Sequence, residues 1–182
     1  AEVRLWVLGS GSRGNAVLLE SQGGRLLVDA GFGVRTLAQR LTGIGVAPES
    51  IAACVITHEH ADHVKGAVQA AQRWGWALHA SEGTIRAHAP LGEAGAMAFR
   101  AGDTLALPGF AVATVRTPHD ALESVALVAT STACGTRAGV CYDLGHAPER
   151  VRTALRELDL LVLEANHDAG MLRAGPYPPS VA

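Results

Sequence analysis

The chain has 182 residues, of which 48% are apolar, and 15 Lys and Arg against 17 Asp and Glu give a formal net charge of -2. This composition suits one folded domain with a real core, and it excludes a disordered chain and a uniform basic field that alone would recruit nucleic acid. The longest apolar runs, residues 51–56 and 160–163, fall far short of the roughly 20 residues that cross a bilayer, so we expect no integral membrane protein.

The first part of the chain has the pattern of three short strands followed by a helix. Apolar runs at residues 3–8, 15–20 and 25–28 are separated by glycines, which predicts a β-meander. Apolar residues then recur at helical spacing over residues 34–41, and glycines follow them. We therefore expect a short helix after the meander.

The middle of the chain predicts a buried strand, a polar loop and a helix. Residues 51–56 are apolar throughout, which fits a strand covered on both faces. The polar stretch 57–63 follows, and helical spacing then predicts one helix over 64–74. Further strands are predicted at residues 77–80, 104–107 and 110–116.

The last part of the chain alternates strands with a helix. Strands are predicted at 125–130, 138–142 and 160–164, and a helix with Pro148 and Glu149 in its first turn lies between the last two. Strands that arrive first in hairpins and later alternate with helices favour sheets covered by helices, the α/β class. We treat residues 1–182 as a single domain.

The most informative stretch is residues 57–63, Thr-His-Glu-His-Ala-Asp-His, at the junction of a buried strand and a helix. Imidazoles and a carboxylate are ligands suited to zinc, iron or manganese. A short loop can aim His58 and His60 to one side while Asp62 and His63 reach another, which allows two adjacent metal positions. The alternative is a solvated polar loop in which Asp62 caps the following helix.

This H-x-H-x-D-H loop after a buried strand resembles the signature of the metallo-β-lactamase superfamily. The resemblance implies an αββα sandwich and two further ligands at strand ends, a His and then an Asp. His119 and Asp143 match these positions in order and context. By the same resemblance, one metal is held by His58, His60 and His119, the second is held in part by Asp62 and His63, and Asp143 bridges both.

Asp29 also matches a family position, the acid at the end of an early strand. The resemblance implies that it steadies the metal loop by fixing the orientation of ligands without touching metal. The alternative is an aspartate that merely starts a Gly-rich turn.

Five elements spread over nearly the whole chain resemble the YycJ-like (WalJ) branch of the superfamily. They are residues 8–16, 29–31, 119–121, 143–146 and 164–168. The branch implies a stand-alone bacterial hydrolase acting on phosphodiesters, with exonuclease action on DNA as its usual suggested activity.

The sequence departs from the branch at its end. Family members continue past the Gly-Pro-Tyr-Pro element into a helix, a last strand and a Gly-His-Leu-Ser-type motif whose histidine completes the second metal site. We expect that a C-terminal segment with these elements is missing from the sequence. The alternative is that His167 takes over the ligand position.

The predicted function is that of a binuclear hydrolase with two divalent cations, zinc first and manganese or iron as alternatives. Two cations would lower the pKa of a shared water from 15.7 to about 7, and the resulting hydroxide would attack DNA or a small phosphodiester. Asp62 would orient this nucleophile, and His146 or His167 would protonate the departing oxygen. Arg13, beside the Gly-rich turn, is the expected phosphate contact.

Two other functions remain open at this stage. The same hydroxide could cleave esters, lactones or thioesters, as in other branches of the superfamily. A non-catalytic protein that only holds metal or binds nucleic acid is the second alternative, although a net charge of -2 gives DNA binding little support.

The number of cysteines indicates the cellular compartment in which the protein resides. Cys54, Cys134 and Cys141 cannot all pair within one chain, and no signal segment precedes Val3. We therefore expect a cytoplasmic protein in a reducing environment.

Overall fold

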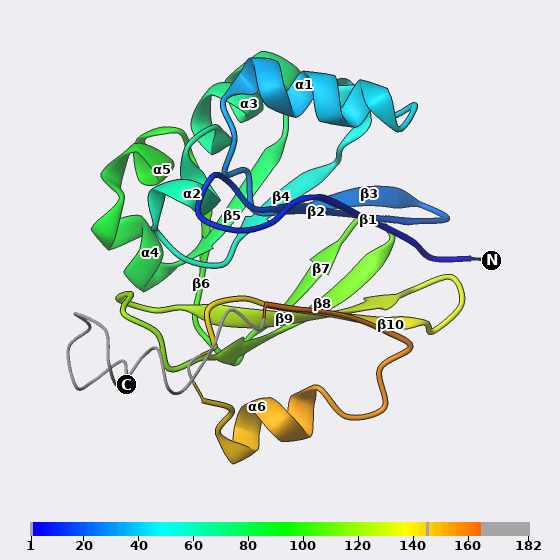
Figure 1. The fold of residues 1–182 in the computed structure, drawn as a ribbon, viewed down its shortest axis with the longest axis vertical. Helices are drawn as coiled ribbons and strands as arrows, with labels where there is room; N and C mark the ends of the chain where they lie inside the picture. Colours follow the sequence, from blue (N-terminus) through cyan, green and yellow to red (C-terminus); the bar gives the residue numbers. More distant parts are fainter. Residues whose placement is uncertain (1, 145, 165–182) are drawn as a thin grey trace.

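The computed structural model describes residues 2–144 and 146–164. Two β-sheets pack face to face, and helices cover their outer faces, so that the layers follow the order helix, sheet, sheet, helix (Figure 1). The predicted α/β class and the αββα sandwich are confirmed.

The first sheet has the strand order β1-β2-β3-β4-β5-β6. Strands β1 to β3 are antiparallel, and β3 to β6 run parallel, so β3 and β4 end at the same edge of the sheet. The strands are β1 (Arg4–Gly9), β2 (Ala16–Ser21), β3 (Gly24–Val28), β4 (Ala53–Ile56), β5 (Ala77–Ser81) and β6 (Met97–Phe99).

The second sheet has the strand order β11-β10-β9-β8-β7. Neighbouring strands are antiparallel except β10 and β11, which are parallel. The strands are β7 (Thr104–Leu107), β8 (Phe110–Arg116), β9 (Val125–Ser131), β10 (Arg137–Cys141) and β11 (Leu160–Leu163).

The helices are distributed unequally between the two outer faces. Helices α1 and α3 lie over the first sheet, and α6 lies under the second (Figure 1). The helical segments are α1 (Val34–Gly43), η1 (Pro48–Ser50), α2 (Ala61–Val64), α3 (Ala67–Trp74), α4 (Glu82–Ala87), α5 (Ala89–Glu93) and α6 (Glu149–Ala154). Within the described part of the chain, no helix is long and apolar enough to cross a membrane.

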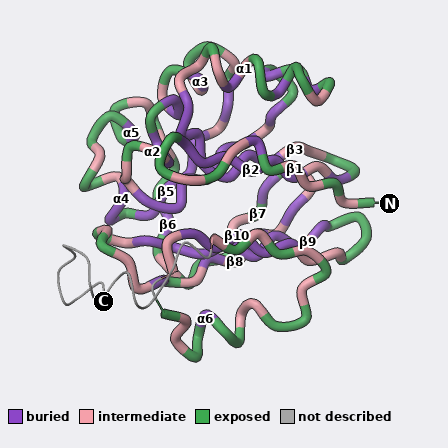
Figure 2. Tube along the Cα trace, in the orientation of Figure 1, coloured by how far each residue is buried: buried purple, intermediate pink, exposed green. Residues whose placement is uncertain are grey.

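Alternation of side chains along the strands builds two main cores. On β2, Val17 and Leu19 point between the sheets, whereas Ala16 and Leu18 point toward the helices. Phe110 is completely buried between the sheets. Full burial of a Leu or Phe contributes roughly 1.5–3 kcal/mol, so these cores fix the spacing of the sheets. Buried residues accordingly follow the strands in Figure 2.

Three details differ from the sequence-based expectations. The single helix predicted over 64–74 is wrong, because α2 ends at Val64 and α3 begins after Gly66. The Gly66 amide donates to the Ala30 carbonyl at 2.8 Å instead of to the preceding helical turn, which interrupts the helix. A Cβ atom on Gly66 would lie 2.0 Å from the Phe32 carbonyl oxygen, so glycine is required there. His63 consequently lies on α2 instead of in a loop. The pattern also missed β6, α4 and α5, which are too short to show a clear period.

The segment after β3 packs tightly against α2. The Gly31 amide donates to the Asn15 carbonyl at 2.9 Å, and the Asn15 amide donates to the Asp62 carbonyl at 2.7 Å. A Cβ atom on Gly31 would lie 1.7 Å from that Asp62 oxygen. Only glycine allows this approach of three backbone segments.

We expect Gly31→Ala to lower the free energy of unfolding by roughly 3 kcal/mol, because backbone atoms must move to admit the methyl group. Gly43→Ala is the matched control, since nothing lies within 4 Å of its added Cβ and alanine favours the end of α1. Urea denaturation of both variants measures the difference. Equal stabilities would contradict the packing described for Gly31.

Candidate metal centre

Four separate segments bring polar side chains to one edge of the sandwich. Asp29 follows β3, and residues 57–60 follow β4. His119 lies in the turn between β8 and β9, and Asp143 follows β10. Because the first two come from one sheet and the last two from the other, the site lies where the two sheets meet.

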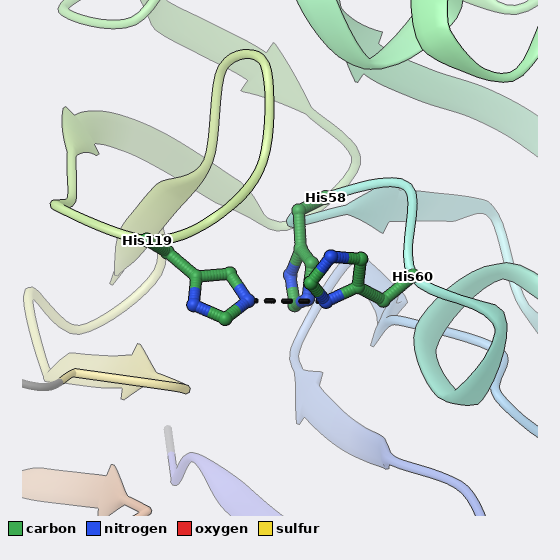
Figure 3. Close-up of side chains that lie close together, drawn as sticks. All are labelled: His58, His60 and His119. Carbon is green, nitrogen blue, oxygen red and sulfur yellow. Dashed lines mark hydrogen bonds between the residues drawn. The ribbon is translucent and has the colours of Figure 1, made fainter. Parts of the chain in front are cut away.

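Three imidazoles converge at this edge. The ring centroids of His58 and His60 are 4.7 Å apart. The ring centroid of His119 is 4.7 Å from that of His58 and 4.8 Å from that of His60. The Nε2 atom of His119 lies 3.1 Å from Nδ1 of His60 (Figure 3). One nitrogen from each ring can point at a common centre, with these atoms within 4.8 Å of one another. Three imidazole nitrogens with an open fourth position are typical of a catalytic zinc site.

A second group shares His58 with the first and adds His63 and Asp143. The Oδ2 atom of Asp143 lies 3.3 Å from Nε2 of His58, 3.2 Å from Nε2 of His63 and 3.8 Å from Nε2 of His119. Oδ2 of Asp62 is 3.6 Å from Nε2 of His63. Asp143 therefore lies between the two groups, and Asp62 lies beside the second.

The buried carboxylate of Asp29 organises the ligands from behind. Its Oδ1 accepts the Thr57 amide hydrogen at 2.7 Å, and its Oδ2 accepts from the Thr57 hydroxyl and from Nδ1 of His63, each at 2.7 Å. Since the Thr57 hydroxyl donates to Asp29, its oxygen is free to accept from Nδ1 of His58, 3.0 Å away. Both imidazoles then turn their Nε2 atoms toward the centre.

Asn15 is a site residue to which the sequence analysis gave no role. Its side chain is buried, and its Nδ2 donates to Asp62 Oδ2 at 3.2 Å and lies 3.1 Å from Nε2 of His63. Its position in the Gly-rich turn of residues 8–16 was the available signal. Thr57, immediately before the first histidine, was also missed, because a threonine that ends a strand has no distinctive pattern.

The backbone is unusual at two of these positions. Asp29 has φ of 61° and Asp143 has φ of 50°, and only Glu157 shares a positive φ among the other non-glycine residues of the described ranges. The left-handed region costs energy for any residue with a side chain, although Asp tolerates it better than most. Both strained residues are aspartates whose carboxylates point toward the histidines.

The two adjacent histidines have opposite proton affinities. Burial disfavours protonation of His63, but the carboxylates of Asp29 and Asp143 outweigh burial and raise its pKa to about 10. Burial and the neighbouring His63 lower the pKa of His58 to about 2. Burial raises the pKa of Asp143, but the hydrogen bond and charge of His63 prevail and lower it to about 2. The acidic groups thus favour positive charge at this centre.

The residues fit a divalent cation. The Nε2 atom of His58 is buried and has no hydrogen-bond partner among the described residues, a costly state for a lone pair unless a ligand occupies it. A cation between the three histidines would satisfy this atom, and Asp143 would supply the compensating charge. His58, His60 and His119 could therefore hold one cation, and His63 and Asp143, with Asp62 beside them, could hold part of a second.

Three other predicted residues are not joined to this centre by any described contact. Arg13 and His146 are described, and both are exposed. Neither makes a hydrogen bond or ion pair with the six candidate ligands within the described ranges. His167 lies outside the residues that the structure describes.

We expect Asp29→Asn to weaken cation binding by about 10–100-fold, because one acceptor oxygen becomes an NH2 group that cannot accept, and the three donors of Thr57 and His63 need both oxygens. Asparagine tolerates the positive φ at this position, so the backbone should persist. Asp103→Asn is the control, since the Asp103 side chain accepts only the Arg100 amide hydrogen among the described residues, in the turn before β7. Competition between the protein and a chelator for Zn²⁺ measures the affinities. An unchanged affinity in Asp29→Asn would contradict its assigned role.

Two exodeoxyribonucleases are similar to this chain in sequence over most of its length. The exodeoxyribonuclease WalJ of Streptococcus pneumoniae serotype 2 (strain D39) is 33% identical over 178 residues, which are 94% of this chain and 65% of the relative. The exodeoxyribonuclease YycJ of Bacillus anthracis is 28% identical over 181 residues, 96% of this chain and 67% of the relative. The chain thus spans about two thirds of the length of these relatives, and the predicted resemblance to the YycJ-like branch is confirmed.

Solved structures show the same fold. A metallo-β-lactamase of Cronobacter sakazakii with a HARLDQ motif superimposes with a TM-score of 0.70 at 18% identity, covering 87% of this chain and 76% of the other. The subclass B3 enzyme MEM-A1 from a soil metagenome gives 0.64 at 20% identity, covering 87% and 75%. The sequence pattern of the Metallo-beta-lactamase superfamily matches residues 9–155. The chain therefore belongs to the metallo-β-lactamase superfamily.

Proposed function

We propose that this protein is a metal-dependent hydrolase with a binuclear centre, and that it cleaves phosphodiester bonds of DNA as an exonuclease. The observation that carries the proposal is the position of Asp143 Oδ2 within 3.8 Å of His58, His63 and His119 at once. One carboxylate oxygen shared by two ligand groups suits two adjacent cations. The names of the WalJ and YycJ relatives support DNA as the substrate.

Divalent cations at this centre would supply Lewis acidity, both to activate water near neutral pH and to neutralise charge on a phosphoryl group. The protein's contribution is to hold the ligands in fixed orientations. Asp29 and Thr57 fix the two buried imidazoles, and Asn15 fixes Oδ2 of Asp62. Asp62 would orient the attacking water and accept its proton.

The exposure of the ligands allows a long substrate to reach them. His58 and His63 are buried at the base of the centre. Asp62 and Asp143 have 31% and 29% of their side-chain surface exposed, and His119 has 18%. The centre thus has a buried base and an accessible front, so a phosphodiester on a polymer can approach without opening the fold.

Two further roles belong to this proposal. Arg13 is exposed in the turn that begins at Gly11, whose amide donates to Asn15 Oδ1 at 2.9 Å. Since Asn15 contacts Asp62, this turn is anchored at the centre, and Arg13 would bind a substrate phosphate from its rim. His146, three residues after Asp143, would protonate the leaving oxygen, a role that His167 could also perform.

We expect His60→Ala and Asp62→Ala each to lower the rate of DNA hydrolysis at least ~100-fold while the fold persists, because each removes a ligand or the proton acceptor. His88→Ala is the control, since the His88 side chain makes no capping hydrogen bond to α5 and His88 belongs to neither ligand group. End-labelled single- and double-stranded DNA, incubated with the Zn²⁺- or Mn²⁺-loaded protein, measures the rate.

Full turnover in both variants would contradict the mechanism. Hydrolysis of an ester, lactone or thioester without cleavage of DNA or bis-p-nitrophenyl phosphate would leave the metal centre in place but replace the substrate class. Salt-dependent DNA binding without any turnover, whatever metal is added, would favour a non-catalytic protein.

A further inference from the structure

The position of His119 depends on one turn of the second sheet. Residues 117–124 connect β8 to β9, and we call this segment the His119 turn. At its base, the Thr117 amide donates to the Ser124 carbonyl at 3.0 Å, and the two hydroxyls are 2.8 Å apart. His58 and His60 come from the first sheet, so whatever holds the tip of this turn sets the distance across the three-histidine group (Figure 3).

Glu59 reaches this tip from the metal loop itself. Its Oε1 accepts the backbone amide hydrogen of Leu122 at 2.7 Å, and its Oε2 lies 3.4 Å from the Thr84 hydroxyl on α4. Glu59 stands between His58 and His60 in the sequence, and it belongs to neither ligand group. The two histidines contribute to the centre while the intervening carboxylate binds the turn that carries the third.

A second carboxylate makes the reverse connection. Glu123, in the His119 turn, accepts the amide hydrogens of Gly83 at 2.7 Å and Ala101 at 2.9 Å. The Ser81 hydroxyl at the end of β5 donates to the Glu123 carbonyl at 2.8 Å. These bonds fix the far side of the turn to the end of β5, to α4 and to the segment after β6. Leu122 is 47% exposed and gains little from packing, so its backbone hydrogen bonds restrain it. Its carbonyl accepts from Nη2 of Arg116, at the end of β8, at 3.0 Å, whereas its amide bond to Glu59 joins the turn to the metal loop.

We propose that Glu59 is a positioning residue that holds the His119 turn at the distance required for three-histidine cation binding. The inference rests on the proposed metal centre and goes beyond it, because it assigns a role to a residue outside the ligand set. The Glu59 side chain is long enough to place its acceptor oxygen at the Leu122 amide, and this length, not its negative charge, determines the role.

Two conservative substitutions separate reach from charge. Glu59→Asp keeps the charge but shortens the side chain by one methylene, so the carboxylate no longer reaches Leu122. Glu59→Gln loses the charge but keeps a carbonyl oxygen at Oε1, and its amide can donate to Thr84. Glu93→Asp is the matched control, since Glu93 is exposed on α5 and makes no hydrogen bond or ion pair within the described ranges.

The experiment titrates the full metal-free chain with Co²⁺ alone and follows the visible absorption of the bound ion, with a chelator as competitor. Circular dichroism first establishes that each metal-free variant is folded. We expect Glu59→Asp to weaken Co²⁺ binding at least ~10-fold and to alter the absorption bands, whereas Glu59→Gln and Glu93→Asp stay within about threefold of the unsubstituted chain.

Each other result has a definite meaning. If Glu59→Asp binds Co²⁺ as tightly as the unsubstituted chain, the positioning role is overturned while the metal centre stands. If Glu59→Gln loses as much affinity as Glu59→Asp, charge matters and the role in reach is again overturned. If the unsubstituted chain binds no Co²⁺, the metal centre fails, and the positioning role fails with it.

Discussion

Three hydrogen bonds of 2.7 Å converge on the buried carboxylate of Asp29, and the geometry of the whole centre depends on them. Thr57 and His63 bind this carboxylate directly, and His58 joins through the Thr57 hydroxyl. A buried charge is costly unless it is fully hydrogen-bonded, and here that requirement also determines which imidazole nitrogens face the centre. The hydrogen bonds that stabilise the buried Asp29 carboxylate therefore also fix the orientations of His58 and His63.

The centre has two kinds of support, because its residues come from two sheets. The first sheet supplies the base: β3 and β4 run parallel, so Asp29 and the metal loop end side by side, and glycine at position 31 lets the backbone of α2 approach closely. The second sheet supplies His119 and Asp143 from its own strand ends. The sheets are held together by the apolar core between them and by carboxylate hydrogen bonds beside the centre.

Much of this could be predicted from particular residues. The spacing His58, His60, Asp62 and His63 after an apolar strand indicates metal binding because capping or solubility does not require three imidazoles in six positions. Asn15, Thr57 and Glu59 had no such signal: each is an ordinary polar residue until its partner is known, and those partners lie 47, 28 and 63 positions away in the sequence. The break between α2 and α3 was likewise hidden, because it depends on the hydrogen bond from the Gly66 amide to the Ala30 carbonyl in a distant segment.

The sequence by itself determined the chemistry, since donor atoms are properties of residue types and a six-residue motif keeps them close whatever the rest of the chain does. It also determined the layers, because alternating and helical periodicities assign the faces that must be buried. Only the tertiary structure decided which atoms meet. The 3.3 Å between His58 and Asp143, and the 2.7 Å between Glu59 and Leu122, depend on the packing of two sheets, and no local pattern encodes a distance between segments that only the core brings together.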